Sequence, residues 1–176
     1  ENATPTVFAM TNPFTPPTLE SIGEGLSVIS VPDERWLHCD IKSISLLGNI
    51  LARQTAVEAG AIEAVLFRDG YLTEGASSNI WVVKDGKLLA PPHDNLILEG
   101  IRYELMEELA RRSGIPFEAR RISQDEVRNA DELLLTAATK EVKPITRLDG
   151  QPVGKGVPGP IFHKLFAAYQ EVKAQR

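Results

Sequence analysis

Residues 63–90 read EAVLFRDGYLTEGASSNIWVVKDGKLLA, and this stretch decides the fold class. It contains two strongly apolar runs, each followed by an Asp-Gly pair and then by a second apolar run. Asp-Gly is a preferred sequence for the two-residue turn that joins antiparallel strands. We therefore predict two β-hairpins, one that turns at Asp69-Gly70 and one that turns at Asp85-Gly86.

The sequence on both sides of this stretch predicts further strands. Apolar or alternating runs typical of strands occur at Leu26–Val31, Arg35–Leu37, Phe117–Ile122 and Leu133–Thr136. A third Asp-Gly pair, Asp149-Gly150, predicts another hairpin near the C-terminal end.

Helices are predicted where apolar residues recur at a spacing of three and four. A helix that ends at Gly60 has an apolar face made by Ile44, Leu47, Leu51, Ala52 and Ala56. A second helix begins after Gly100 and turns Leu105, Met106 and Leu109 inward. A short third helix is predicted by the capping-box pair Ser123 and Glu126, and a last one presents Ile161, Leu165, Ala168 and Val172. Hairpins interleaved with helices predict an α+β fold with mixed or antiparallel sheets, and not a doubly wound parallel sheet.

The composition limits the classes of function. The 176 residues are 43% hydrophobic and 24% charged, with a net charge of −5, which is typical of one globular domain. An acidic chain without a basic stripe is not expected to bind nucleic acid. No apolar run reaches the roughly 20 residues that a membrane helix requires. The single cysteine, Cys39, excludes an internal disulfide and a Cys-rich zinc site, and we expect a reduced, cytoplasmic environment and no bound metal.

Residues 1–25 differ in composition from the remainder. The first 18 contain four prolines among threonines and almost no charge, which predicts an extended connector. We therefore divide the chain into a linker, 1–25, and a folded domain, 26–176.

Two ionisable residues lie at positions where chemistry is conceivable. Lys42 lies between a predicted strand and an apolar helix, and its ordinary explanation is a side chain that extends to solvent. Burial would instead lower the pKa of the amine and free it as a nucleophile. Glu74 belongs to the polar run Thr73–Asn79, which is either a solvated loop or the position of a buried carboxylate that holds a proton on a heterocyclic nitrogen.

Two turns of small residues are candidates for anion binding. In Leu98–Arg102, Gly100 lets the backbone approach a ligand, and the amides of Ile101 and Arg102 lie at a helix N-terminus, which suits a phosphate. The second turn, Thr136–Thr139, follows a strand and offers further amides. Neither turn identifies a ligand by itself, because many α+β proteins contain such turns.

Together, in this order and spacing, these segments resemble the fold-type IV pyridoxal-phosphate enzymes. The resemblance extends from Leu26 to about Tyr169, and it is carried by Arg35–Ser43 with Leu46–Asn49, Thr73–Asn79, Ile97–Ile101 and Thr139–Pro144. The first of these runs is most similar to the D-amino acid aminotransferases. The resemblance implies a pseudo-barrel of mixed sheets with surrounding helices, the cofactor pyridoxal 5'-phosphate, amino acid and 2-oxo acid substrates, and a homodimer.

The resemblance also implies a role for each matching residue. Lys42 matches the lysine that binds the cofactor and moves a proton between the substrate Cα and C4′ of the cofactor. Glu74 matches the carboxylate that pairs with the pyridinium nitrogen, and Leu98 the apolar residue packed on the ring. The remaining cofactor-binding positions are Ile101 and Arg102 at the first phosphate turn, Ala137 and Ala138 at the second, and Ser77 nearby.

Some features depart from the family pattern. Family members often have Thr then Arg where this chain has Arg102-Tyr103, and a hydroxyl residue is common at the position of Ala138. The family also has a small N-terminal domain ahead of the linker, which is absent from this chain. We expect that the chain is the large domain of a longer protein and that it binds the cofactor poorly alone.

Several functions stay open at this point. The favoured function is transfer of an amino group between a D-amino acid, such as D-alanine, and a 2-oxo acid. The same lysine serves aminodeoxychorismate lyases and branched-chain L-amino acid aminotransferases of the superfamily. An inactive structural fragment without cofactor and an unrelated α+β binding domain are the alternatives from other classes.

Overall fold

The computed structural model describes residues 4, 6–13, 15, 18–22 and 25–175. The helices are α1 (Leu19–Ile22), α2 (Leu47–Glu58), α3 (Tyr103–Arg112), α4 (Gln124–Arg128) and α5 (Pro160–Ala174). The strands are β1 (Leu26–Pro32), β2 (Glu63–Arg68), β3 (Tyr71–Gly75), β4 (Asn79–Lys84), β5 (Lys87–Ala90), β6 (Phe117–Ala119), β7 (Glu132–Ala137), β8 (Glu141–Leu148) and β9 (Gln151–Pro152).

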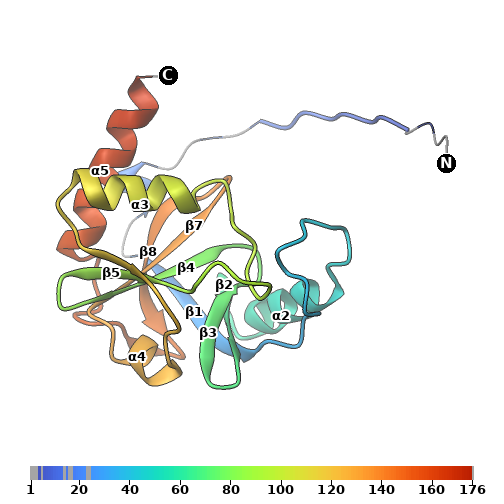
Figure 1. Cartoon of the computed structure of the whole chain (residues 1–176), viewed down its shortest axis with the longest axis horizontal. Coiled ribbons are helices and arrows are strands. Elements are labelled where there is room, and N and C mark those ends of the chain that lie inside the picture. The colour runs from blue at the N-terminus through green and yellow to red at the C-terminus, as the bar shows by residue number, and fades with distance from the viewer. Residues whose placement is uncertain (1–3, 5, 14, 16–17, 23–24, 176) are drawn as a thin grey trace.

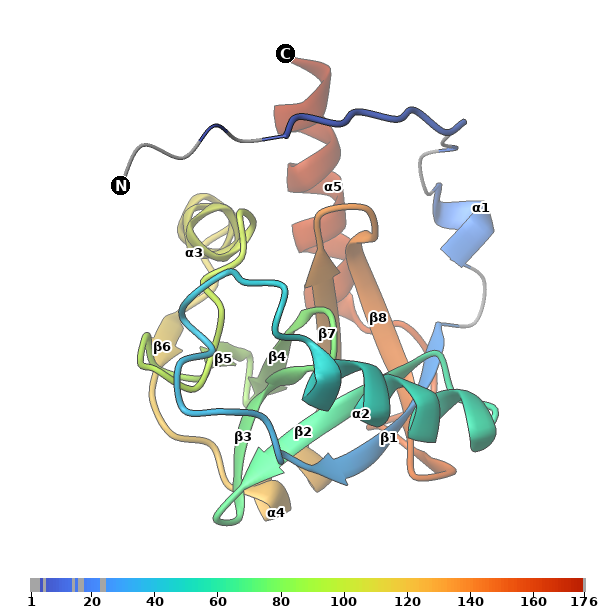
Figure 2. The same cartoon turned by 90° about the vertical axis from the view of Figure 1, so that its right-hand side faces the viewer.

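The strands form one mixed sheet in the order β3-β2-β1-β8-β7-β4-β5-β6, with β9 paired to β8. The pairs β1–β2, β1–β8 and β5–β6 are parallel, and the others are antiparallel. The sheet curls into a half-barrel, with α3 and α5 on one side of it and α2 on another (Figures 1 and 2). The predicted α+β fold with mixed sheets in a pseudo-barrel is therefore confirmed.

The Asp-Gly turns are where the sequence places them. Asp69, Asp85 and Asp149 have φ angles of 52°, 49° and 51°, and the glycine after each also has a positive φ. A turn with positive φ at two consecutive residues has a backbone twist that matches the twist of the two antiparallel strands it joins. The pairs β2–β3, β4–β5 and β8–β9 confirm the three predicted hairpins.

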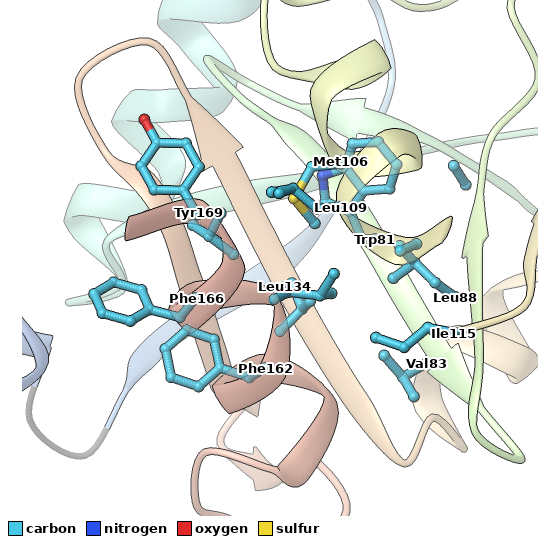
Figure 3. Close-up of a cluster of buried hydrophobic side chains, with 14 of the residues drawn as sticks. Trp81, Val83, Leu88, Met106, Leu109, Ile115, Leu134, Phe162, Phe166 and Tyr169 are labelled. Carbon is cyan, nitrogen blue, oxygen red and sulfur yellow. The ribbon is translucent and has the colours of Figure 1, made fainter. Parts of the chain in front are cut away.

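Both faces of the central strands are buried. Along β4, Trp81 and Val83 join a cluster under α3 and α5, whereas Ile80 and Val82 join a cluster on the opposite face. Figure 3 shows the first cluster, to which α5 contributes Phe162, Phe166 and Tyr169. Burial on both faces explains why β4 is a continuous apolar run and not an alternating one.

Helix α2 packs through its smallest residues. Ala52 and Ala56 lie against β1 and β2, but Leu47 and Leu51 are 69% and 57% exposed, and Ile44, just before the helix, is 97% exposed. Of the five residues predicted to form one apolar face of this helix, only the two alanines are buried, and Ile44 lies outside the helix. The alanines permit close approach to the sheet, so the neighbouring stripe of leucines is left on the surface.

Two predicted strands differ from the structure. Arg35–Leu37 is part of an irregular loop, because Arg35 bonds back to Asp33 and leaves no strand ladder. The strand expected over Phe117–Ile122 ends at Ala119, and the Ile122 carbonyl accepts from Leu72 instead.

The N-terminal and C-terminal helical segments also differ in detail. Helix α1 falls inside the expected connector 1–25, part of which lies outside the described residues. On α5, Phe162, Phe166 and Tyr169 are buried with the predicted Leu165, and the other predicted residues are partly buried.

Among the described residues, no helix combines the length and apolarity needed to cross a membrane.

The N-terminus of α5 is fixed by a buried carboxylate of β7. Glu132 Oε1 accepts from the amide of Ile161, and Glu132 Oε2 accepts from the amide of Phe162, both at 2.8 Å. These amides have no partner within the helix, and the positive end of the helix dipole favours the carboxylate charge. Glu132 therefore joins α5 to the middle of the sheet.

We predict that Glu132→Gln lowers the free energy of unfolding by about 1–2 kcal/mol, because an amide group presents a donor to one helix amide and carries no charge. Urea unfolding followed by circular dichroism measures this. The matched control is Glu171→Gln, at an exposed position of the same helix. Equal losses in the two variants would contradict the role of Glu132.

Candidate functional site

Glu74 lies in a buried ion cluster at the end of β3. Arg35 Nη1 contacts Glu74 Oε1, while Arg35 Nη2 and Nε donate to the two carboxylate oxygens of Asp33 at 2.8 and 2.9 Å. All three residues are buried. One guanidinium therefore joins the end of β1 to β3 through two carboxylates.

The two carboxylates differ in the donors that they receive. Asp33 also accepts from Thr73 Oγ1 at 2.8 Å, and Arg68 Nη2 lies 3.1 Å from its Oδ1. Burial acts to raise the pKa of Asp33, but the hydrogen bonds and charge of Arg35 outweigh it and hold that pKa below its usual value. Burial raises the pKa of Glu74 to about 7, and the charge of Arg35 offsets this only in part.

Arg35 itself stays cationic. Burial acts to lower its pKa, but the hydrogen bond to Asp33 and the charges of Glu74 and Asp33 raise that pKa above the usual value. The cluster is thus a cation with one firmly ionised carboxylate and a second one, Glu74, that exchanges a proton near neutral pH. Such a carboxylate can share a proton with a ring nitrogen.

The backbone of Leu98 is fixed against this carboxylate. The amide of Leu98 donates to Glu74 Oε2 at 3.1 Å, and Asn79 Nδ2 donates to the Leu98 carbonyl at 2.9 Å. Asn79 also leaves no room for a side chain at position 100, because a Cβ atom on Gly100 would collide with Asn79 Oδ1. The run Thr73–Asn79 is therefore a frame that positions the Leu98–Arg102 turn, and not a solvated loop.

A third buried carboxylate, Glu63, organises the other half of the same run. Its Oε2 accepts from Ser77 Oγ at 2.7 Å, from Ser78 Oγ at 3.2 Å and from Lys140 Nζ at 3.1 Å. Glu63 has no exposed surface, whereas Ser77 is exposed. Glu63 thus ties the Ser77 turn to Lys140, in the turn between β7 and β8.

The two predicted phosphate turns lie side by side. Arg102 Nε donates to the carbonyl of Ala137 at 2.8 Å, and Arg102 Nη2 donates to the carbonyl of Ala138 at 2.6 Å. Within the described residues, the amides of Ile101, Arg102, Ala138 and Thr139 donate no hydrogen bond. Unpaired amides at a helix start and at an adjacent turn are suited to an anion.

Lys42 lies in the loop between β1 and α2, and its side chain is exposed. The described residues therefore do not provide the burial that would free its amine. The loop is held at the same edge of the molecule as Glu74: the amide of Cys39 donates to the Asn95 carbonyl at 2.9 Å, and Arg35 Nη2 donates to the Leu96 carbonyl at 3.0 Å.

The structure thus brings some of the predicted site residues together and leaves others apart. It joins Glu74 to Leu98 directly, and it joins Arg102 to Ala137 and Ala138. It places Ser77 on the Glu63 network, and it shows no direct bond from Lys42 to the other predicted residues among the described part of the chain. A cavity of about 180 Å³ at Ser30, Phe67 and Gln124 contains none of the predicted site residues.

Sequence reasoning missed the residues that support the site. Four supporting residues lie in or beside the motif segments, but no role was predicted for them: Asp33, Arg35, Asn79 and Glu63. A signal was available for Glu63, because a charged residue at the start of the apolar run Ala64–Phe67 requires a partner when it is buried. Arg35 has one partner two positions away, Asp33, and another 39 positions away, Glu74, and no local pattern indicates the second.

These groups fit a phosphorylated pyridine aldehyde in part. Glu74 supplies a carboxylate for the ring nitrogen, and the unpaired amides supply an anion site. Lys42 supplies an accessible primary amine, which an aldehyde requires.

Comparison with known proteins agrees with this chemistry. A family model described as Amino-transferase class IV matches residues 1–148. The chain is 44% identical to a D-alanine aminotransferase of Bacillus licheniformis and 39% identical to one of Staphylococcus aureus (strain MSSA476). Each match covers 167 residues, which are 95% of this chain and 59% of the relative.

Solved structures of aminotransferases are also similar to this chain. The branched-chain aminotransferase of Thermoproteus uzoniensis, with norvaline, has a TM-score of 0.79 at 30% identity, and the match covers 85% of this chain and 51% of the other. The branched-chain amino acid aminotransferase of Thermobaculum terrenum, in its PLP form, has a TM-score of 0.78 at 30% identity, and the match covers 89% of this chain and 54% of the other. The chain spans little more than half the length of the relatives that it matches.

We predict a pH dependence of stability that Glu74→Gln removes. The pKa of Glu74 is raised from 4.5 to about 7, so the folded state binds this proton more tightly than the unfolded chain does. The resulting stabilisation is complete below pH 4.5 and is lost as the pH rises to about 7. The lowered pKa of Asp33 acts below pH 3.8, outside this window.

Urea unfolding at pH 5, 6, 7 and 8 measures this difference. The free energy of unfolding of the unsubstituted chain, minus that of Glu74→Gln, is expected to fall between pH 5 and 7 and then to level off. Glu171→Gln, at an exposed position, serves as the control with a constant difference. A constant difference for Glu74→Gln would show that its carboxyl group does not titrate in this range.

Proposed function

Because this chain belongs to the class IV aminotransferase family, we propose that it is the cofactor-binding part of a pyridoxal-phosphate-dependent transaminase for D-amino acids. The observation that carries the proposal is 44% identity, over 95% of the chain, to a D-alanine aminotransferase. The substrates are a D-amino acid, such as D-alanine, and a 2-oxo acid.

Each site residue has a role in this proposal. Lys42 holds the cofactor and moves a proton at its Nζ atom. Glu74 holds the proton of the ring nitrogen, with Arg35 to balance its charge and Leu98 against the ring. The bound cofactor supplies an electron sink for the bond that breaks at the substrate Cα.

The phosphate group is assigned to the two turns. Unpaired amides of Ile101 and Arg102 face it from the first turn, and Ala137 and Ala138 belong to the second. Ser77 lies near these groups through Glu63 and Lys140. Backbone amides can bind a phosphate without the side-chain hydroxyl that is common in the family at the position of Ala138.

The domain organisation belongs to the same proposal. Residues 1–25 connect a small N-terminal domain of the longer protein to the cofactor domain, 26–176. Support comes from the length comparison, since the chain spans 59% of the D-alanine aminotransferases. The protein acts in the cytoplasm, for which the support is a single cysteine, Cys39, and no disulfide framework.

A branched-chain L-amino acid aminotransferase is the second candidate. The specific observation in its favour is the similarity to solved branched-chain aminotransferases, at a TM-score of 0.79 for the one from Thermoproteus uzoniensis. The greater sequence identity to D-alanine aminotransferases favours the D-amino acid function. An aminodeoxychorismate lyase and an inactive fragment have less support, and measurements of cofactor binding and product formation separate them.

The test of cofactor binding uses this chain, pyridoxal phosphate and removal of the excess. We predict that the chain retains a weak visible absorption band, as expected for poor binding by the cofactor domain alone, that Lys42→Ala abolishes the band, and that Lys155→Ala, at an exposed position elsewhere, preserves it. A band that survives in Lys42→Ala would contradict the role of Lys42. A chain without any band would support the inactive fragment.

The same preparations separate the candidate activities. D-alanine with a 2-oxo acid is expected to yield pyruvate, whereas L-leucine as the preferred amino donor would favour the branched-chain function. Pyruvate from aminodeoxychorismate, without an added oxo acid, would favour the lyase. Lys42→Ala is the control in each assay.

The protein is also a homodimer in this proposal, and α2 provides the support. Leu47, Ile50 and Leu51 are exposed apolar residues of the helix, and Ile44, just before it, is exposed as well. Exposed apolar residues of this kind mark surfaces that another chain covers.

We predict that Leu47→Asp shifts the protein from dimer to monomer in sedimentation velocity, because an aspartate cannot be buried unpaired in an apolar interface. The control is Val157→Asp, which places the same charge at a similarly exposed valine outside α2. A monomeric unsubstituted chain, or an unchanged dimer in Leu47→Asp, would contradict an interface at α2.

A further inference from the structure

Arg102 holds the Ala137–Lys140 turn through hydrogen bonds to two carbonyl groups of that turn. Its Nε and Nη2 atoms donate to the carbonyls of Ala137 and Ala138. In a trans peptide the carbonyl and the following N–H point in opposite directions. The amides of Ala138 and Thr139 therefore point away from the guanidinium, and neither donates to the described residues.

Helix α5 holds Arg102 in turn. Arg102 Nη1 donates to the Tyr169 hydroxyl, and the guanidinium carbon lies 5.1 Å from the centre of the Tyr169 ring. In Figure 3 the Tyr169 hydroxyl points away from the other labelled side chains of the cluster. The third guanidinium nitrogen is thus bound by the helix, and the other two are bound by the turn.

The far end of the turn is also tied to α5. Glu141 has a φ angle of 58°, a conformation that costs a non-glycine residue about 1 kcal/mol or more. Its buried carboxylate accepts from Lys173 Nζ at 2.7 Å and from Gln170 Nε2 at 3.0 Å. Contacts from one helix therefore hold the residue that ends the turn in this unfavourable conformation.

We propose that Tyr169, Gln170 and Lys173 of α5 are positioning residues for the anion site formed by the two turns. They act through Arg102 and Glu141, and they do not touch the ligand themselves. The ligand chemistry is a phosphate monoester, which rests on the proposed function, since the phosphate of pyridoxal phosphate is assigned to this site.

One consequence concerns the turn itself, without any cofactor. The amide of Lys140 donates to the Ala137 carbonyl at 3.2 Å, which closes the turn. Loss of the contacts from α5 is expected to open the turn locally. Hydrogen exchange by NMR is expected to show the Lys140 amide exchanging about tenfold faster in Tyr169→Phe and in Lys173→Met, with the amides of β4 unchanged.

Two controls accompany these variants. Lys164→Met removes an exposed lysine from the same helix and is expected to leave the Lys140 amide unchanged. Lys173→Arg keeps a cation opposite Glu141 and is expected to restore slow exchange. Unchanged exchange in both test variants, or faster exchange throughout the sheet, would overturn the positioning role.

A second measurement connects the turn to the phosphate group. The affinity of the chain for pyridoxal phosphate and for pyridoxal is compared in each variant. Tyr169→Phe and Lys173→Met are expected to weaken pyridoxal phosphate about tenfold and to leave pyridoxal unchanged. Equal weakening of both ligands, or no weakening of either, would overturn the assignment to the phosphate.

The two measurements test the proposed function and the role of α5 independently of each other. If the unsubstituted chain binds no pyridoxal phosphate, the proposed function fails for this chain, and the Lys140 exchange rate still decides whether α5 positions the turn. If exchange is unaffected while pyridoxal phosphate binds to Lys42, the function stands and the role of α5 is overturned.

Discussion

The buried guanidinium of Arg35 is the interaction on which the site depends. It lies between Asp33, just after β1, and Glu74, on β3, and it contacts both of these buried carboxylates. Removal of one member would leave an uncompensated buried charge, which is far more costly than an exposed ion pair. The bonds continue from Glu74 to the amide of Leu98, so the cluster fixes the β1–α2 loop and the Leu98–Arg102 turn against one strand.

The division of donors within the cluster has a chemical consequence. Asp33 receives bonds from Thr73, from Arg68 and from two guanidinium nitrogens of Arg35, and its pKa is held low. Glu74 receives a single contact from the guanidinium, and burial raises its pKa to about 7. A carboxylate with this pKa holds its proton loosely at neutral pH, which suits a partner that is itself a weakly acidic ring N–H.

The sequence predicts what depends on local interactions. Turns at Asp69-Gly70 and Asp85-Gly86 follow from backbone preference, and the capping box of Ser123 and Glu126 is present as predicted. Glu74 and Leu98 were predicted through a family resemblance, and the structure joins them directly. Sequence reasoning failed at Leu47 and Leu51, because periodicity shows an apolar face but not whether the chain itself covers it. It missed the contact of Arg35 with Glu74 and that of Glu63 with Lys140, because these partners are distant in sequence.

The two departures of this chain from its family pattern are connected in the structure. In the proposed phosphate site, Arg102 stands where family members often have Thr, and Ala138 stands where a hydroxyl residue is common, so the site has two fewer side-chain donors. Arg102 donates instead to the carbonyls of Ala137 and Ala138, which turns the following amides outward. A side chain that orients backbone donors thus takes the place of side chains that donate directly. Because Arg102 is in turn hydrogen-bonded to Tyr169, the proposed anion site depends in part on α5.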